Sequence, residues 1–131
     1  MTKATYLDSS AIVKLAVREP ESDALRRYLR RRRPLVSSAL ARTEVIRALL
    51  PGGDEALAAG RRVLTRIDLL RINKAVLDSA GTLVPVTVRS LDAIHLATAA
   101  QLGSDLGVLV TYDDRMAQAA GEAGHRVIAP Q

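Results

Sequence analysis

Residues 107–111, GVLVT, form a short apolar, β-branched run of the kind that is buried in a parallel sheet. Working outward from it, four further short runs have the composition of strands and are separated by stretches with helical spacing. They are ATYLD at 4–8, LVSS at 35–38, IDLLRI at 67–72 and HRVIAP at 125–130. The spacing of these runs predicts five strands along the chain.

The intervening stretches predict helices, because apolar residues recur in them every three or four positions and Pro, Gly or Asn punctuates them. The expected ranges are 9–19 stopped by Pro20, 21–33 stopped by Pro34, 39–50, 54–66, 75–83 capped by Asn73, 92–102 opened by Ser90 or Asp92, and 113–123. Alternation of strands with helices predicts an α/β fold, with a parallel sheet of about five strands flanked by helices on both faces. A length of 131 residues suits one domain, spanning 1–131.

The composition restricts the chemistry that a site can use. There is no cysteine, which excludes disulfides and thiolate ligands, and the two histidines, His95 and His125, lie far apart. Any metal is therefore expected to have oxygen ligands. No apolar run near the N-terminus is long enough for a signal peptide or a membrane span, so we expect a cytoplasmic protein without a membrane partner.

The net charge of +5, carried mostly by arginine, favours a phosphate-bearing partner such as nucleic acid. With no Phe or Trp and three Tyr, a base-stacking platform is not expected, so RNA would be contacted mainly through its phosphates. Any individual arginine can equally be a surface residue that contacts only solvent and no nucleic acid. The run Arg30 to Arg33 can contact RNA phosphates or simply stabilise the C-terminal end of a helix.

Four carboxylates stand out by their positions. Asp8 directly follows the first strand, Asp113 follows GVLVT by two residues, and Asp92 lies in the first turn of a helix. In a parallel sheet such positions gather at one edge. Each of these three aspartates can also be a helix cap. Glu44 lies inside a helix on a stripe of small residues, so it is either a fourth member of the cluster or a surface glutamate paired with Arg42 or Arg47.

If the four carboxylates converge, their repulsion calls for a cation, and Mg²⁺ held by carboxylates and water is the natural choice. Such an ion activates water for hydrolysis of phosphodiester bonds. Because no histidine stands where a general base is needed, this route fits better than a histidine-based nuclease. For His95, one turn after Asp92, we expect an orienting or structural role.

Four segments in order resemble the motifs of the PIN domain, and most closely those of VapC-type toxin ribonucleases. The segments are YLDSSAIVKL (6–15), SSALARTEVIRAL (37–49), SLDAIHLATA (90–99) and LVTYDDRMAQAAGEAG (109–124). The resemblance spans roughly residues 5 to 128. It implies a magnesium- or manganese-dependent endoribonuclease, the toxin of a type II toxin–antitoxin pair.

The resemblance also implies roles for individual residues. Asp8, Glu44, Asp92 and Asp113 match the four acidic, metal-binding positions of the family, and Ser10 and Thr111 match hydroxyl positions that orient the carboxylates or bind water. Asp114 could compete with Asp113, although the T-x-D spacing favours Asp113. Related toxins cut structured RNAs such as transfer RNA, pair with a VapB-type antitoxin and usually form homodimers.

Two other functions are compatible with the residues. A PIN-like domain could bind RNA or a protein without cutting, although all four acidic positions are filled here. A phosphoacceptor domain of the response-regulator type would need a lysine after a late strand, and Lys74 is the last lysine in the chain.

Overall fold

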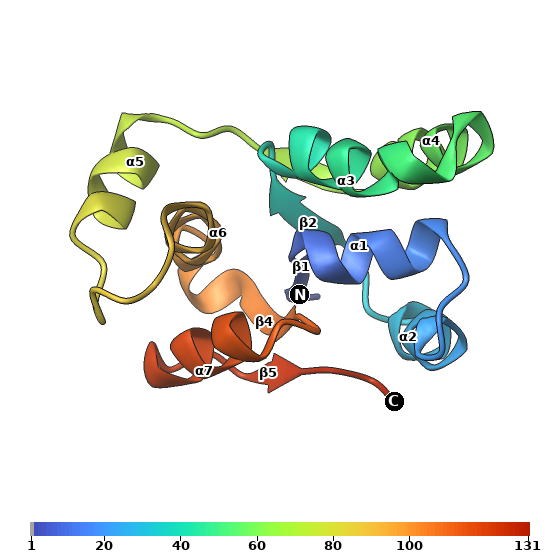
Figure 1. Cartoon of the computed structure of the whole chain (residues 1–131). Coiled ribbons are helices and arrows are strands. Elements are labelled where there is room, and N and C mark those ends of the chain that lie inside the picture. Colours follow the sequence, from blue (N-terminus) through green and yellow to red (C-terminus); the bar gives the residue numbers. More distant parts are fainter. Residues whose placement is uncertain (1) are drawn as a thin grey trace.

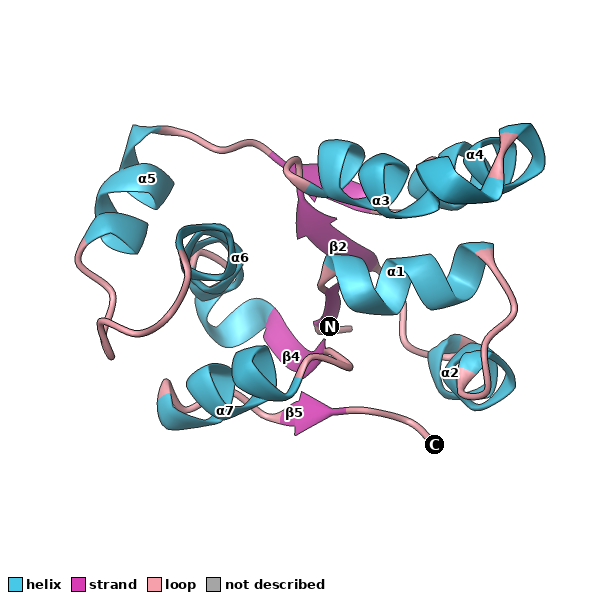
Figure 2. Cartoon of the chain, in the orientation of Figure 1, coloured by secondary structure: helices cyan, strands magenta, loops and turns pink. Residues whose placement is uncertain are grey.

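The computed structural model describes residues 2–131, and its centre is a parallel five-stranded sheet (Figures 1 and 2). The strands are β1 (Ala4–Leu7), β2 (Leu35–Ser38), β3 (Asp68–Leu70), β4 (Leu106–Val110) and β5 (Val127–Ile128). Their order across the sheet is β3-β2-β1-β4-β5, and every neighbouring pair is parallel. The predicted α/β class and strand number are confirmed.

Seven α-helices connect the strands. They are α1 (Ser9–Ala16), α2 (Ser22–Leu29), α3 (Ala41–Leu49), α4 (Asp54–Leu64), α5 (Lys74–Gly81), α6 (Ser90–Ala100) and α7 (Asp114–Glu122). Two 3₁₀ turns, Leu50–Gly52 and Gly103–Asp105, follow α3 and precede β4. None of the helices in the described part of the chain is both long and apolar enough to cross a membrane.

The helices cover both faces of the sheet, as predicted (Figure 2). Successive strand residues point to opposite faces, so Leu7 packs in one apolar cluster with helices α1 to α4, while Tyr6 packs in the other with α6 and α7. Helix α5 packs against α6 and lies further from the sheet (Figure 1). Two separate cores therefore hold the sheet from its two sides.

Several predicted helix boundaries are wrong, mostly because the helix ends before the last residue of the pattern from which it was predicted. Helix α2 ends at Leu29 and not at Arg33, leaving the arginine run in an exposed turn where the Arg32 guanidinium lies 4.1 Å from the centre of the Tyr28 ring. Helix α1 ends at Ala16, because Val17 is already extended. Asn73 caps α5 as predicted, accepting from the backbone N–H of Val76 at 2.9 Å.

The strand order determines where a ligand can bind. From β1 the chain moves outward through β2 to β3, and then returns to the other side of β1 for β4 and β5. The order therefore reverses between β1 and β4. In open parallel sheets the crevice beyond the carboxyl ends of such strands is the usual binding site.

Candidate active site at the carboxyl edge of the sheet

Asp8 lies at this reversal, immediately after β1, and caps α1. Its Oδ1 accepts from the Ala11 backbone N–H at 3.1 Å. Asp113, after β4, caps α7 by accepting from the N–H groups of Arg115 and Met116 at 2.9 and 3.2 Å. Asp8 and Asp113 are thus helix caps, which is one of the two roles that the sequence predicted for each of them. Both caps use Oδ1 alone, so Oδ2 of each carboxylate is not used by the cap, and that of Asp8 accepts from Thr111 Oγ1.

Two hydroxyl groups hold the Asp8 carboxylate. Ser10 Oγ donates to Oδ1 at 2.6 Å, and Thr111 Oγ1 donates to Oδ2. Each hydroxyl oxygen also accepts a backbone N–H, from Tyr112 at 3.0 Å and from Asp113 at 3.1 Å respectively. A hydroxyl has a single proton to donate, so these amides leave both protons directed at Asp8. The turn after β4 therefore fixes the carboxylate that follows β1.

Burial of the Asp8 carboxylate disfavours its charged form. Only 4 % of the residue is exposed, and burial raises the pKa of its carboxyl above the ordinary value despite the donors from Ser10, Thr111 and the Ala11 amide. Burial raises a carboxyl pKa because the charged form loses hydration. The ionised form of Asp8 would consequently be stabilised by a nearby cation.

Glu44, half-buried in the first turn of α3, faces the same edge and has two donors. Ser9 Oγ and His95 Nε2 each lie 2.6 Å from its Oε1. Burial acts to raise the pKa of Glu44, but the hydrogen bonds from His95 and Ser9 outweigh it and leave the pKa below the ordinary value. No ion pair joins Glu44 to Arg42 or Arg47 within residues 2–131. The surface-pair alternative is therefore wrong.

His95 connects Glu44 to the core. A carboxylate oxygen can only accept, so Nε2 carries the proton of the bond to Glu44, while Nδ1 lies 2.8 Å from the hydroxyl of Tyr6. Both Tyr6 and His95 are buried, at 0 % and 2 % exposure. The imidazole is thereby clamped between β1 and α3 and acts as a support for Glu44, in keeping with the orienting role expected of it.

Asp92, the last of the four carboxylates predicted from the sequence, lies in α6. Its helix begins at Ser90, one of the two predicted openings, and Arg89 occupies the cap position. Asp92 therefore lies in the first turn, and the alternative that it caps the helix is wrong. Burial raises the pKa of Asp92, and the charges of Asp113, Asp8 and Glu44 raise it further, whereas His95 lowers it. The charges of Asp8, Glu44 and Asp113 thus act on Asp92 in the direction expected of other carboxylates.

Their arrangement is open. Within the described residues 2–131, no three or more Asp, Glu, His or Cys side chains are close enough to enclose a metal ion. The donors are nevertheless all hard oxygen atoms, and Asp8 is a buried carboxylate without a cationic partner. Mg²⁺ commonly uses one or two carboxylates and completes its shell with water and phosphate. The residues present fit that kind of ion and do not fit a closed cage made only by protein.

Some residues of the site were not predicted as parts of it. Ser9 follows Asp8 directly, but nothing in the spacing shows that it turns to Glu44, which lies on another helix. Tyr6 was expected only as part of a strand. Its contact with His95 joins β1 to α6, so it depends on the tertiary structure.

Comparison with known proteins shows which family this chain resembles in sequence. A model of the PIN domain matches residues 5–122. Ribonuclease VapC46 of Mycobacterium tuberculosis (strain ATCC 25618 / H37Rv) is 70% identical over 127 residues, which cover 97% of this chain and 98% of that protein. Ribonuclease VapC35 of the same strain is 43% identical over 129 residues, covering 95% of this chain and 96% of that protein.

Solved structures with the same fold include a toxin and a chain of a toxin–antitoxin complex. The crystal structure of Mycobacterium tuberculosis VapC20, described as a Sarcin-Ricin loop cleaving toxin, matches with a TM-score of 0.75 and 18% identity over 96% of this chain and 99% of that chain. A toxin–antitoxin complex from Klebsiella pneumoniae matches with a TM-score of 0.73 and 22% identity, covering 97% of this chain and 98% of that chain. At these identities the likeness concerns the fold.

Proposed function

This chain belongs to the PIN domain family and is similar to its VapC ribonucleases, and from this premise we propose that it is an endoribonuclease acting as the toxin of a toxin–antitoxin pair. The observation that best supports the proposal is that Asp8 and Asp113 lie beyond the carboxyl ends of β1 and β4, on the two sides of the reversal of strand order, and that the charges of Asp113, Asp8 and Glu44 act to raise the pKa of Asp92.

We propose Mg²⁺ or Mn²⁺ as the cofactor, with Asp8, Asp92 and Asp113 as ligands and Glu44 acting through water. When bound, such an ion supplies charge stabilisation on phosphoryl oxygens and activation of an attacking water. The chain's own residues prepare the site. Ser10 and Thr111 keep the Asp8 oxygens oriented, and the donors from Ser9 and His95 favour an ionised Glu44 that can accept a proton from water.

The proposed partners follow from the family and from the surface. RNA, such as a structured transfer RNA, is the substrate, and a VapB-type protein is the antitoxin. A homodimer is supported by four exposed apolar side chains on α5, on the segment between α5 and α6, and in the first turn of α6, namely Leu77 (49% exposed), Val84 (74%), Val86 (89%) and Leu91 (49%). Large exposed apolar side chains in neighbouring elements are typical of surfaces that contact another protein.

The test is cleavage of total transfer RNA by the purified chain with Mg²⁺, with Mn²⁺ and with EDTA. The wild-type protein should cut in either metal and not in EDTA, and Asp92→Asn should reduce the rate at least about a hundredfold, the scale on which loss of a catalytic charge acts. Asp105→Asn is the matched control, since Asp105 is an exposed aspartate at the opposite, amino edge of β4.

Equal rates for Asp92→Asn and Asp105→Asn would overturn the assignment of the site. RNA binding without cleavage in either metal would instead favour a binding module.

A further inference from the structure

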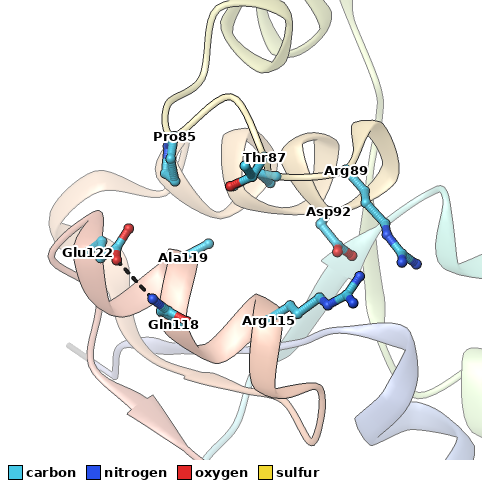
Figure 3. A pocket seen from close by; sticks show the side chains of 9 residues that line it. Pro85, Thr87, Arg89, Asp92, Arg115, Gln118, Ala119 and Glu122 are labelled. Carbon is cyan, nitrogen blue, oxygen red and sulfur yellow. Dashed lines mark hydrogen bonds between the residues drawn. The ribbon is translucent and has the colours of Figure 1, made fainter.

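A pocket of about 300 Å³ opens beside Asp92, between α7 and the segment that leads into α6 (Figure 3). It lies next to the carboxylate cluster but extends away from it, and none of the residues lining it except Asp92 belongs to the proposed catalytic set. A volume of this size lies at the lower end of the range for small-molecule sites. The pocket can therefore accept one unit of an extended ligand.

Two arginines stand at the Asp92 end of the pocket. Figure 3 shows the side chains of Arg89 and Arg115 on either side of the Asp92 carboxylate. In the part of the chain that the structure describes, neither guanidinium lies within 4.0 Å of a carboxylate oxygen, whereas Arg18 and Arg26 both reach Asp23. The two guanidinium groups keep their donors for an external acceptor.

Helix stability does not explain these arginines. Arg89 is the N-terminal flanking residue of α6 and makes no capping hydrogen bond, and Arg115 is the second residue of α7. A cation at a helix N-terminus is disfavoured by the helix dipole. Both positions therefore cost some stability in the free protein and suit the binding of an anion, for which the guanidinium fork matches phosphate.

The rest of the pocket suits a nucleoside. Its walls include the apolar side chains of Pro85, Val88 and Ala119, against which a base or ribose can pack in the absence of aromatic residues. At the end away from Asp92, Gln118 Nε2 donates to Glu122 Oε1 at 3.3 Å (Figure 3). This amide–carboxylate pair presents donors and acceptors to the edge of a base.

We propose that this pocket binds one nucleotide of the RNA strand adjoining the phosphate that is cut. Arg89 and Arg115 hold its flanking phosphates, the apolar wall receives its base, and Gln118 with Glu122 contacts the base edge. The inference rests on the proposed ribonuclease function and adds a substrate subsite to it. The RNA strand then runs from Asp92 through the pocket between α7 and the segment that leads into α6.

The test measures binding without metal. Binding of a fluorescein-labelled, single-stranded RNA of random sequence is followed by anisotropy in EDTA at several salt concentrations. The double variant R89A/R115A should bind at least about tenfold more weakly than wild type, given the energy of charge-assisted hydrogen bonds. The loss of two phosphate contacts should also make the slope of log K for RNA binding against log salt concentration shallower by about 1.4.

The control R62A removes an exposed arginine of α4, on the other face of the sheet, and should leave both quantities within twofold of wild type. The melting temperature of R89A/R115A should be equal to or above that of wild type, because two unfavourable helix-end charges are removed. A second variant, Gln118→Ala, should change which nucleotide is preferred next to the cut while leaving the salt slope unchanged.

Equal affinity and equal salt slope for R89A/R115A and R62A would overturn the subsite, as would a wild-type protein that does not bind RNA. These results are distinguishable from failure of the proposed function. That failure shows as an absence of cleavage by the wild-type chain in Mg²⁺ and Mn²⁺, whatever the binding assay gives.

Discussion

At the scale of single residues, the site consists of carboxylates whose surroundings differ. Asp8 is buried with three neutral donors, and its pKa is raised by burial. Glu44 has a histidine and a serine on one oxygen, and its pKa is lowered in spite of burial. Metal-free protein should therefore favour an ionised Glu44 and disfavour an ionised Asp8. A cation removes the penalty on Asp8.

The raised pKa of Asp8 predicts how stability depends on pH. Because the folded protein holds the Asp8 proton more tightly than the unfolded chain, wild type loses stability from this group as the pH rises from about 4, the ordinary aspartate value, through the folded-state pKa. Asp8→Asn stays neutral and, as asparagine, keeps the helix cap. Its free energy of unfolding relative to wild type should therefore increase with pH.

Urea unfolding in EDTA between about pH 4 and pH 7 measures this difference. Adding Mg²⁺ at neutral pH should stabilise wild type more than Asp8→Asn, because only wild type retains the buried carboxylate ligand. A difference in the free energy of unfolding that is constant with pH, or that decreases as the pH rises, would show that the folded protein does not disfavour the charged form of Asp8.

The individual residues of the site were predictable to different degrees. Asp8 and Asp113 could be placed because Asp8 directly follows β1, Asp113 comes three residues after the end of β4, and each immediately precedes a helix. The pair Ser9–Glu44 and the chain Tyr6–His95–Glu44 could not, since they join residues 35 to 89 positions apart whose side-chain directions depend on packing. Local spacing carries no information about such contacts.

At the scale of elements, strand positions followed the apolar runs closely, and helix ends did not. LVSS coincides with β2 because all four residues are buried. The arginine run looked helical because arginine is a good helix former, yet α2 ends at Leu29, its last buried residue. Helix length here is set by what the helix can bury, which a pattern shows only in part.

Packing of α4 on α3 predicts a clear effect of glycine substitution. A Cβ built on Gly60 would lie 2.4 Å from Leu49 Cδ1, in a buried contact, whereas a Cβ on Gly121 in α7 meets nothing within 4 Å. Leu49 is only 3% exposed, so its side chain has little room to turn away, and overpacking of this kind costs about 1–3 kcal/mol. This cost is at or above the gain of about 1 kcal/mol from replacing a helical glycine. Gly60→Ala should therefore lower the free energy of unfolding.

Gly121→Ala, with the same gain and no clash, should raise the free energy of unfolding by about 0.5–1 kcal/mol. Chemical denaturation of both variants measures the contrast. If Gly60→Ala were as stable as Gly121→Ala, α3 and α4 would not be packed as closely as the structure places them.

At the scale of the whole molecule, alternation of strands and helices predicted the layers, but the order of the strands had to come from the structure. The reversal between β1 and β4 is what brings Asp8 next to Thr111, 103 positions away. The site is therefore a property of the topology. The sequence could indicate Asp8 and Asp113 as candidates because parallel strands end at a common edge, whichever order they take.

The proposed dimer is also a property of the whole molecule. Val86→Asp places a charge at an apolar side chain that is 89% exposed and that the proposed dimer would bury, and should convert the dimer to a monomer, because a buried unpaired charge is costly. Leu50→Asp, at an apolar residue exposed to 50% after α3, is the control and should leave the dimer intact. Light scattering after gel filtration measures the mass. A monomeric wild type, or a dimeric Val86→Asp, would contradict this interface.

The most direct test of the central proposal, that the four carboxylates hold the catalytic ion, is the anomalous signal of Mn²⁺ in crystals of wild type and of Asp92→Asn. We expect a peak in wild type between the carboxylates of Asp8, Asp92 and Asp113, near the Glu44 side, and its loss or strong reduction in Asp92→Asn. Manganese bound only elsewhere on the protein, or an undiminished peak in Asp92→Asn, would contradict the account.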